Sequence, residues 1–510
     1  MNRKPLVFGT SIVALVASLS ACNFPTGPTR GLTLEAVRQT MAAVTPLAAS
    51  TAPATEAAGP APSPVRIKHP FPITDAPGAA FNYTTRPGDT LEALALRFGV
   101  EPAQILGGSP LPAGGYVPIG LELQIPNVLE AMSPGGDLLP DGELVYSPTA
   151  KNFDLPSFVA SADGYLSRYL ETMEDDTVLS GTAIVQRVAD ENSLNPRLLL
   201  VLLEFRTAWV YGAPRNADAT KYPIGFRISG RSGLYQELSV AATQLNLGYY
   251  GWRAGTVLET TYEDGGVVRW NPSLNAGSMA LLRLFALLSG SDRWIDEMVG
   301  LQGFPARYET MFGDGWSRAQ AASPILPSDL EQPLLELPFA PGEAWSLTAG
   351  PHNAWSYGTP RGALDLSPIT GGDPCAVSAR WVTASAPGVI VRAADNAVVL
   401  DLDGDGYEST GWTVLYYHLA DDGMIAPGTQ VAEGDLLGHP SCQGGRTTGK
   451  HVHLVRKYNG EWLAADGPVP LVLSGWQAVA DERNYYGTLV RGNEVVTSDS
   501  SGRQGSTIRR

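Results

Sequence analysis

The sequence predicts a multidomain α+β protein with three folded parts: a small βααβ domain, an all-α helical domain and a C-terminal domain of mainly antiparallel β-structure. Three observations lead to this prediction. The chain has 510 residues, which is enough for two to four ordinary domains with separate cores. Apolar residues recur at helical spacing over about 150–330 and alternate with polar residues from about 335 onward. A region rich in alanine, proline and threonine precedes these parts.

The charge balance argues against a nucleic-acid partner. The formal net charge is −16 at pH 7, and no cationic stripe is present that could neutralise phosphates. The hydrophobic content of 44% and the charged content of 17% are typical of globular proteins. An acidic, globular protein is the simplest interpretation of these values.

Residues 1–22 have the features of an export signal. Basic residues precede an apolar stretch that is short for a membrane span, and the segment ends in LSAC. This ending resembles the lipobox of bacterial lipoproteins, which implies that Cys22 becomes the lipidated first residue of the mature chain. Acyl chains would then hold the protein at a membrane surface. The alternative is ordinary cleavage near Ala21, in which Cys22 has no role.

Residues 23–79 are predicted to form a disordered linker. Alanine, proline and threonine dominate this stretch, so it cannot bury enough apolar surface to fold. Such a composition favours extended, semi-stiff conformations. We therefore expect a spacer between the export signal and the folded domains, and no role for His69.

Residues 80–128 show the pattern of a strand, two short helices and a strand. Asp89 and Thr90 are expected to cap the first helix, and Gly99 to end it. The segment resembles the LysM module through its first strand, the run PGDTL at 87–91 and the closing Ile-Pro pair. This resemblance implies binding of glycans that contain N-acetylglucosamine. The alternative is a small structural domain that has lost its ligand.

Residues 150–330 are predicted to be helical. Asn195-Pro196 and Asn271-Pro272 are each expected to begin a helix as N-cap and first residue. The helix after Asn195 faintly resembles the one that carries the catalytic glutamate of lysozyme-like lytic transglycosylases. That resemblance implies Glu204 as a general acid beside a glycan cleft. A helical spacer or a pro-like regulatory domain is the favoured alternative.

The β domain is predicted over residues 335–490, with a polar tail at 491–510. It contains Cys375 and Cys442, and export makes a disulfide between them the economical prediction. Closing this long loop would contribute on the order of 4 kcal/mol in the chain-entropy model. The alternative, a zinc site built from thiolates, needs more cysteines than the chain has.

Four of the six histidines of the chain gather in this domain, and we interpret a further one, His439, as a loop residue. His451 and His453 are separated by one residue on a predicted strand, so both imidazoles project from one face. His418 ends another strand, and its ring shares a face with the alternate residues of that strand. Several imidazoles at one place indicate a metal site, although a single such histidine is more often a core or surface residue.

From about 345 to 468 the segment resembles the zinc endopeptidases of the lysostaphin and β-lytic type, the M23 family. The β-lytic branch is the closer one, because AGPH at 349–352 precedes ALD at 363–365 by the long spacing of that branch. In the other branch the first ligand falls where this chain has Arg361, which cannot bind zinc.

The resemblance implies roles for five residues. His352, Asp365 and His453 would bind zinc and leave the fourth position to water. His418 and His451 would be catalytic, orienting or deprotonating the water and stabilising the charge that develops on the substrate.

The acidic run at 401–406 resembles the start of an EF-hand loop. Position twelve of such a loop is Trp412 here, where calcium loops need a bidentate glutamate. We therefore favour a polar hairpin over a calcium site.

Together these features predict an exported cell-wall zinc metalloendopeptidase that hydrolyses peptide bonds of peptidoglycan stems or cross-bridges. A LysM-like module would target it to glycan, and the N-terminal lipid would anchor it to the membrane at the cell surface or envelope. The main alternative is a noncatalytic wall-binding scaffold or a regulator of another hydrolase. A secreted proteinase acting on glycine-rich proteins is a third hypothesis.

Overall fold

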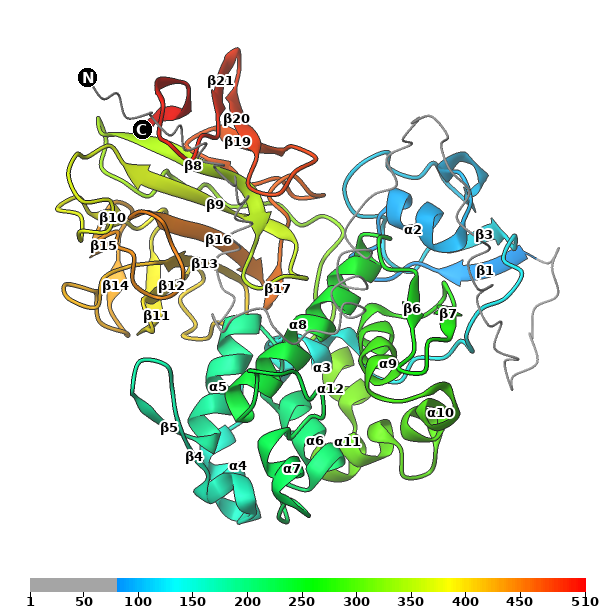
Figure 1. The fold of residues 1–510 in the computed structure, drawn as a ribbon. Coiled ribbons are helices and arrows are strands. Elements are labelled where there is room, and N and C mark those ends of the chain that lie inside the picture. Colours follow the sequence, from blue (N-terminus) through cyan, green and yellow to red (C-terminus); the bar gives the residue numbers. More distant parts are fainter. Residues whose placement is uncertain (1–79) are drawn as a thin grey trace, which may run out of the picture.

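The computed structural model describes residues 80–510 (Figure 1). The predicted export signal with Cys22, the linker and His69 lie outside these residues. Within the described range, no helix is long and apolar enough to cross a membrane.

The first unit is a three-stranded antiparallel sheet with one helix against it. Its elements are β1 (Ala80–Thr84), α2 (Leu91–Phe98), a 3-10 turn (Pro102–Gln104), β2 (Leu106–Gly107) and β3 (Glu122–Pro126), with strand order β1-β3-β2. The side chain of Thr90 accepts from the N–H of Ala93 at 3.2 Å, and Gly99 ends α2 with φ of 70°. The second expected helix is only the 3-10 turn, and β2 is an added strand, because the segment after Pro102 is too short for a helix.

The second unit is mostly helical. Its helices are α3 (Asp141–Leu144), α4 (Leu155–Ala162), α5 (Gly181–Asn192), α6 (Pro196–Thr207), α7 (Ala217–Lys221), α8 (Leu234–Arg253), α9 (Ala276–Leu288), α10 (Ser291–Val299), α11 (Phe304–Phe312) and α12 (Gly315–Ala321). Asn195 is the N-cap of α6, as predicted. Asn271 instead forms a turn in which its side chain accepts from the N–H of Ser273, and α9 begins later, behind Asn275.

The helical unit is not all-α, because it contains two short hairpins. These are β4 (Leu170–Thr172) with β5 (Val178–Ser180), and β6 (Glu259–Thr261) with β7 (Val267–Arg269). Each has an acidic turn in which Asp176 or Gly265 adopts a positive φ, the backbone conformation that tight hairpins need.

The third unit is an antiparallel β domain, as the sequence predicts. Its main sheet has the order β14-β11-β12-β13-β16-β9-β8-β22, with β17 beside β16. The strands of this sheet are β8 (Ala344–Asn353), β9 (Arg361–Pro368), β11 (Gly388–Ala394), β12 (Ala397–Asp401), β13 (Trp412–Tyr417), β14 (Gln430–Val431), β16 (Val452–Tyr458), β17 (Glu461–Trp462) and β22 (Thr507–Arg509). Smaller sheets are formed by β10 (Val382–Thr383) with β15 (Leu436–Gly438), and by β18 (Val472–Leu473), β19 (Trp476–Ala480), β20 (Gly487–Arg491) and β21 (Glu494–Thr497).

Residues 491–510, expected as a polar tail, instead belong to the β domain. They form β21 and β22, and β22 pairs with β8 at the edge of the main sheet. Ile508 is 1% exposed and provides the apolar anchor of this edge strand.

The two faces of the main sheet pack against different partners. Side chains alternate between the faces, so Leu364 and Leu366 join the core inside the β domain, while Ala363 and Val455 join the core of the helical unit. Figure 1 shows α5 and α8 beneath the sheet. Since Asp365 alternates with its neighbours in the same way, the helices pack on the face from which Asp365 projects.

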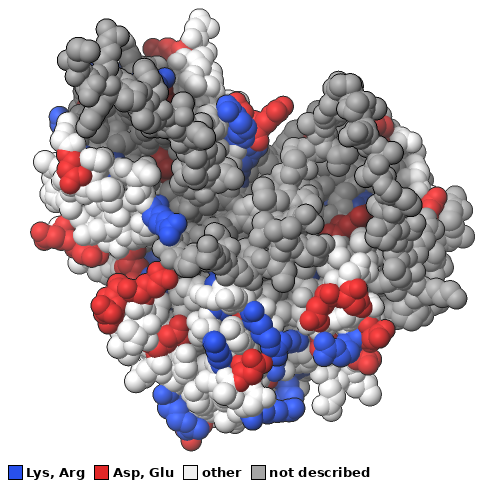
Figure 2. All heavy atoms as spheres, viewed as in Figure 1, with Lys and Arg blue, Asp and Glu red and all other residues white. Residues whose placement is uncertain are grey.

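The visible surface of the helical unit carries charges of both signs. Figure 2 shows lysine and arginine side chains interspersed with aspartate and glutamate over this part of the molecule. This mixed surface is typical of a globular domain and agrees with the composition of the chain.

Candidate metal centre

Adjacent strands of the main sheet bring the five predicted site residues together. The strands β13, β16, β9 and β8 are neighbours in this order. His453 on β16 is the register partner of Asp365 on β9, and His352 lies near the end of β8. His451 directly precedes β16, and His418 directly follows β13. Residues far apart in the sequence therefore meet at one end of the sheet.

His352, Asp365 and His453 form the tightest cluster. The distance from His352 Nε2 to His453 Nδ1 is 3.1 Å, and Asp365 Oδ1 lies 3.2 Å and 3.3 Å from these two nitrogens. All three residues are buried. One potential ligand atom from each lies within 4.8 Å of the others, so the three side chains are close enough to share one ion.

Main-chain carbonyls determine which nitrogen of each ring carries the proton. His352 Nδ1 lies 2.9 Å from the carbonyl oxygen of Gly350, and His453 Nε2 lies 3.0 Å from that of Ala354. Because a carbonyl oxygen only accepts, these nitrogens donate N–H groups, and in the neutral ring that binds a metal the opposite nitrogen carries the lone pair. The lone pairs of both rings therefore point toward each other.

This convergence of acceptors fits a divalent cation. Asp365 Oδ1 is buried without a hydrogen-bond donor, in spite of its short distances to the two rings. Burial opposes the charge of Asp365, but His352 and His451 nevertheless hold the pKa of its carboxyl well below the ordinary value. Two imidazole nitrogens and a carboxylate are a donor set that suits zinc.

His418 and His451 present two further ring nitrogens to the same centre. Their Nδ1 atoms each lie 2.8 Å from a main-chain carbonyl, that of Gln443 and that of Gly449 respectively. Their Nε2 atoms are buried without a partner, and His451 Nε2 lies 3.6 Å from Asp365 Oδ2. Burial lowers the pKa of His418 well below its ordinary value, and the neighbouring His451 lowers it further. A neutral ring with a free Nε2 lone pair is able to accept a proton.

A loop between β19 and β20 also borders the centre, and sequence reasoning missed it. The ring of Tyr485 stacks on that of His352 with centroids 4.6 Å apart, and its main-chain oxygen accepts from the N–H of Gly350 at 2.8 Å. Asn484 donates to the side chain of Asn353 at 2.7 Å. No motif or spacing in this loop indicates the site, because the contacts arise only from the packing of the small sheet on β8.

Cys375 and Cys442 form a disulfide in this structure. Both neighbours of Cys442 in the sequence bond to His418. The N–H of Ser441 donates to the main-chain oxygen of His418 at 2.8 Å, and the carbonyl of Gln443 accepts from its ring. The disulfide therefore lies beside the segment that orients this histidine.

His439 and Arg361, which the sequence analysis did not assign to the metal site, lie away from the cluster of His352, Asp365 and His453. His439 packs on the ring of Trp381 with centroids 3.8 Å apart, and its Nδ1 lies 3.0 Å from the carbonyl of Arg380. Arg361 donates to the main-chain oxygen of Asp481. Neither contributes an atom to the group of possible ligands.

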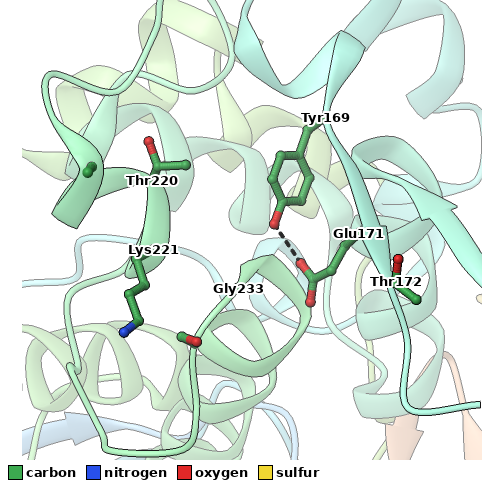
Figure 3. A pocket seen from close by; sticks show the side chains of 8 residues that line it. Tyr169, Glu171, Thr172, Thr220, Lys221 and Gly233 are labelled. Atoms are coloured by element: carbon green, nitrogen blue, oxygen red, sulfur yellow. Dashed lines mark hydrogen bonds between the residues drawn. The ribbon is translucent and has the colours of Figure 1, made fainter. Parts of the chain in front are cut away.

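Glu204 does not line the hollow of about 460 Å³ in the helical unit. That hollow is lined by Tyr169, Glu171, Thr172, Ala217, Thr220, Lys221, Ser232 and Gly233 (Figure 3). The carboxylate of Glu204 instead accepts from the N–H groups of Val210 at 3.1 Å and Tyr211 at 3.0 Å. These bonds hold the turn after α6.

The acidic run at 401–406 forms a polar hairpin. Asp401 accepts from three main-chain N–H groups within 403–406, at 2.9–3.2 Å. Asp401, Asp403 and Asp405 could share an ion by distance alone, but Lys151 already pairs with Asp405 at 2.6 Å. The arrangement agrees with the hairpin that the sequence favours.

Comparisons with known proteins cover both large units. The family model described as LasA, N-terminal domain, matches residues 137–325. Protease LasA of Pseudomonas aeruginosa is 26% identical over 374 residues, which are 68% of this chain and 78% of that protein. The β-lytic metalloendopeptidase of Achromobacter lyticus is 30% identical over 159 residues, 30% of this chain and 40% of that protein. These similarities support an M23 family metallopeptidase of the LasA and β-lytic type.

Part of the chain is also similar to solved structures. One described as a novel M23 metalloprotease, pseudoalterin, is 23% identical and covers 35% of this chain and 99% of that chain, with a TM-score of 0.28. The match to the LasA N-terminal domain falls on the helical unit, where the sequence alone suggested a spacer, a pro-like domain or a lysozyme-like domain.

Proposed function

We propose that the chain is a zinc metalloendopeptidase in which His352 Nε2, Asp365 and His453 Nδ1 bind the metal. The observation that carries this proposal is the meeting of His352 Nε2, His453 Nδ1 and Asp365 Oδ1 within 3.1–3.3 Å of one another in a buried cluster. Three protein ligands leave the fourth zinc position for water, as in catalytic zinc sites. Similarity to Protease LasA and to β-lytic metalloendopeptidase supports the same chemistry.

His418 and His451 are the proposed proton carriers. Bound zinc would supply a Lewis acid that lowers the pKa of water toward neutrality and polarises the scissile carbonyl. Each of the two rings holds its Nδ1–H on a main-chain carbonyl and keeps a lone pair on Nε2. Either ring therefore accepts a proton from the attacking water. Once protonated, it donates a hydrogen bond to the substrate carbonyl oxygen as negative charge develops there.

The proposed substrate is peptidoglycan, cut at peptide bonds of its stems or cross-bridges. The LysM resemblance of residues 80–128 supports this choice. The same unit has a hollow of about 400 Å³, lined by Leu91, Pro102, Ile105 and residues 106–111. Its lining combines polar and apolar surface, which suits a sugar ring with apolar faces and polar edges. Glycan binding at this hollow would raise the effective concentration of the peptidase near its cross-links.

Export and membrane anchoring through Cys22 remain part of the proposal. They rest on the sequence of residues 1–22 alone. Glu204 is left out, because its carboxylate is engaged in capping the turn after α6.

Zinc content and muropeptide release by the intact chain test the proposal. The helical unit and β22 both pack on the β domain, so a shorter fragment is a poor test. We expect one zinc per chain and new peptide ends, with both lost in His453→Ala and His352→Ala. His439→Ala is the matched control and should keep both. A folded wild-type chain that binds no zinc and releases no peptide would instead favour the noncatalytic scaffold.

A further inference from the structure

A short loop carries the carbonyl that orients one of the proposed zinc ligands. Residues 354–360, here named the ligand loop, connect β8 to β9 and thus His352 to Asp365. The loop is closed at its base, where the N–H of Ala354 donates to the carbonyl of Pro360 at 2.8 Å. The carbonyl of Ala354 accepts from His453 Nε2 at 3.0 Å. The position of the ligand loop therefore sets the direction in which His453 Nδ1 points.

The helical unit holds the ligand loop through one buried hydrogen bond. The hydroxyl of Ser356 donates to Asn192 Oδ1 at 3.1 Å, and both residues are buried. Asn192 is the last residue of α5. This bond joins a residue of the helical unit directly to the segment between two proposed ligands.

Close backbone packing adds a second attachment. Gly358 has φ of 105°, and a Cβ atom there would lie 2.8 Å from the main-chain nitrogen of Leu247 in α8. Only glycine fits such an approach. The ligand loop thus rests on both α5 and α8.

Asn192 is itself held rigidly. Its side-chain nitrogen donates to the carbonyl of Val188 at 3.1 Å. Its main-chain oxygen accepts from Asn246 at 3.1 Å and from the indole of Trp462 at 3.4 Å. A side chain fixed at every polar atom is a suitable anchor, because it transmits its position rather than adapting to its partner.

We propose that Asn192 is a positioning residue for His453, so that the helical unit completes the metal centre of the β domain. The inference rests on the proposed zinc function. It assigns the helical unit a role in metal affinity and in the geometry of the ligands. A unit that only covered the site would have no effect on either property.

The test compares zinc affinity between the wild-type chain and three variants of it, measured by competition with a chelator. Asn192→Ala and Ser356→Ala remove the two ends of the bond, and the double variant tests whether they act together. We expect each single variant to bind zinc about threefold to tenfold more weakly. Partners of ligating histidines change affinity by about 10- to 100-fold, and Asn192 acts one contact further out. The double variant should be no weaker than the weaker single variant.

Ser193→Ala is the matched control. Ser193 follows Asn192, is buried in the same interface and donates to the carbonyl of Gly460 at 2.7 Å, away from the ligand loop. It should keep wild-type zinc affinity. Cobalt(II) substitution gives a second readout, in which Asn192→Ala and Ser356→Ala shift the visible absorption bands of the metal and Ser193→Ala does not.

The outcomes separate the two proposals. A wild-type chain that binds no zinc would overturn the proposed function itself. Wild-type affinity and an unchanged cobalt spectrum in both Asn192→Ala and Ser356→Ala would overturn only the role of Asn192. Equal weakening by Ser193→Ala would also overturn it, since the effect would then belong to the whole interface. Should Asn192→Ala fail to fold, Ser356→Ala decides, because it removes only a hydroxyl from the loop.

Discussion

Asp190 faces a charged group of the main sheet from the helical unit. Glu408 is paired with Arg392 at 2.8 Å and with Lys457, and these cations lower its pKa to about 2 in spite of burial. Burial raises the pKa of Asp190 to about 7, although Arg392 opposes this shift. The side chain of Gln186 donates to Asp190 at 2.7 Å. Near neutral pH, Asp190 is therefore partly protonated in the folded chain.

Asp190→Asn should change how stability depends on pH. The folded state keeps a proton on Asp190 that the unfolded state releases above about pH 4, so this group makes stability fall as pH rises from about 4 to 7. The asparagine side chain does not titrate, so the variant should gain stability relative to wild type as pH rises. Urea unfolding at pH 5 and pH 8 measures the difference. Asp422→Asn, on an exposed loop, is the control. If the free energies of unfolding of Asp190→Asn and wild type differed by the same amount at both pH values, the prediction would be contradicted.

The residues of the candidate centre differ in how far the sequence predicts them. His451 and His453 follow from strand alternation, and His352 and Asp365 from a motif with recognisable spacing. The main-chain carbonyls of Ala354 and Gln443 that orient the rings leave no trace in the sequence, since any residue offers a carbonyl. Which carbonyls orient the rings depends on how the loops fold against the strands, and only the structure shows this.

At the scale of elements, β22 protects the edge of the main sheet. Without it, β8, the strand that carries His352, would present unpaired main-chain groups at the edge of the sheet. Ile508 fastens β22 to the core. The last strand is therefore part of the support of the candidate centre.

Ile508→Ala should lower the free energy of unfolding by about 2–4 kcal/mol, because it leaves a cavity under the edge strand. Chemical denaturation measures the loss. Arg509→Ala changes an exposed neighbour on the same strand and should stay within about 0.5 kcal/mol of wild type. If Arg509→Ala lost as much stability as Ile508→Ala, the loss would come from any substitution in this strand and not from the buried side chain.

Element boundaries were predictable where local chemistry decides them. Asn195 with Pro196 begins a helix because the cap and the ring both act within one turn. Asn271 with Pro272 has the same local pattern, yet its side chain turns toward Ser273 and the helix starts later. Both hairpins of the helical unit were missed because their strands have only three residues, too few for alternation to be recognised.

For the whole molecule, Arg253 at the end of α8 is a common contact of all three units. It donates to the carbonyl of Pro87 in the first unit at 2.5 Å, to Asp141 at 3.0 Å and to Glu461 of the β domain at 3.0 Å. Glu461 is 1% exposed, so its charge depends on this partner. Arg253 therefore links the first unit, the candidate for glycan binding, to the β domain.

Arg253→Met should loosen the whole assembly, because it leaves the carboxylate of Glu461 buried without its cation. Removing one partner of a buried pair typically costs about 3–5 kcal/mol. We expect a lower melting temperature and faster proteolytic cleavage between the first unit and α3. Arg168→Met, at an exposed ion pair, should change neither. Unaltered cleavage in Arg253→Met would contradict the role of this residue as a junction.

The order of the units and the antiparallel character of the last one were predictable from composition and periodicity. The packing of the helical unit on the face from which Asp365 projects was not predictable from the sequence. In the sequence, Ala363 and Val455 indicate an apolar face but not its partner, because these side chains would pack equally well against any apolar surface.

The disulfide adds an order in time to the assembly of the centre. Cysteines remain reduced in the cytosol and pair once a chain reaches an oxidising compartment. The carbonyls that orient His352 and His453 are distant in sequence from both cysteines. By contrast, the two main-chain groups bonded to His418, the N–H of Ser441 and the carbonyl of Gln443, flank Cys442. A newly made chain is thus expected to be able to hold its metal before His418 is fixed for proton transfer. On the proposed function, proteolysis would therefore begin only once the chain has reached an oxidising compartment.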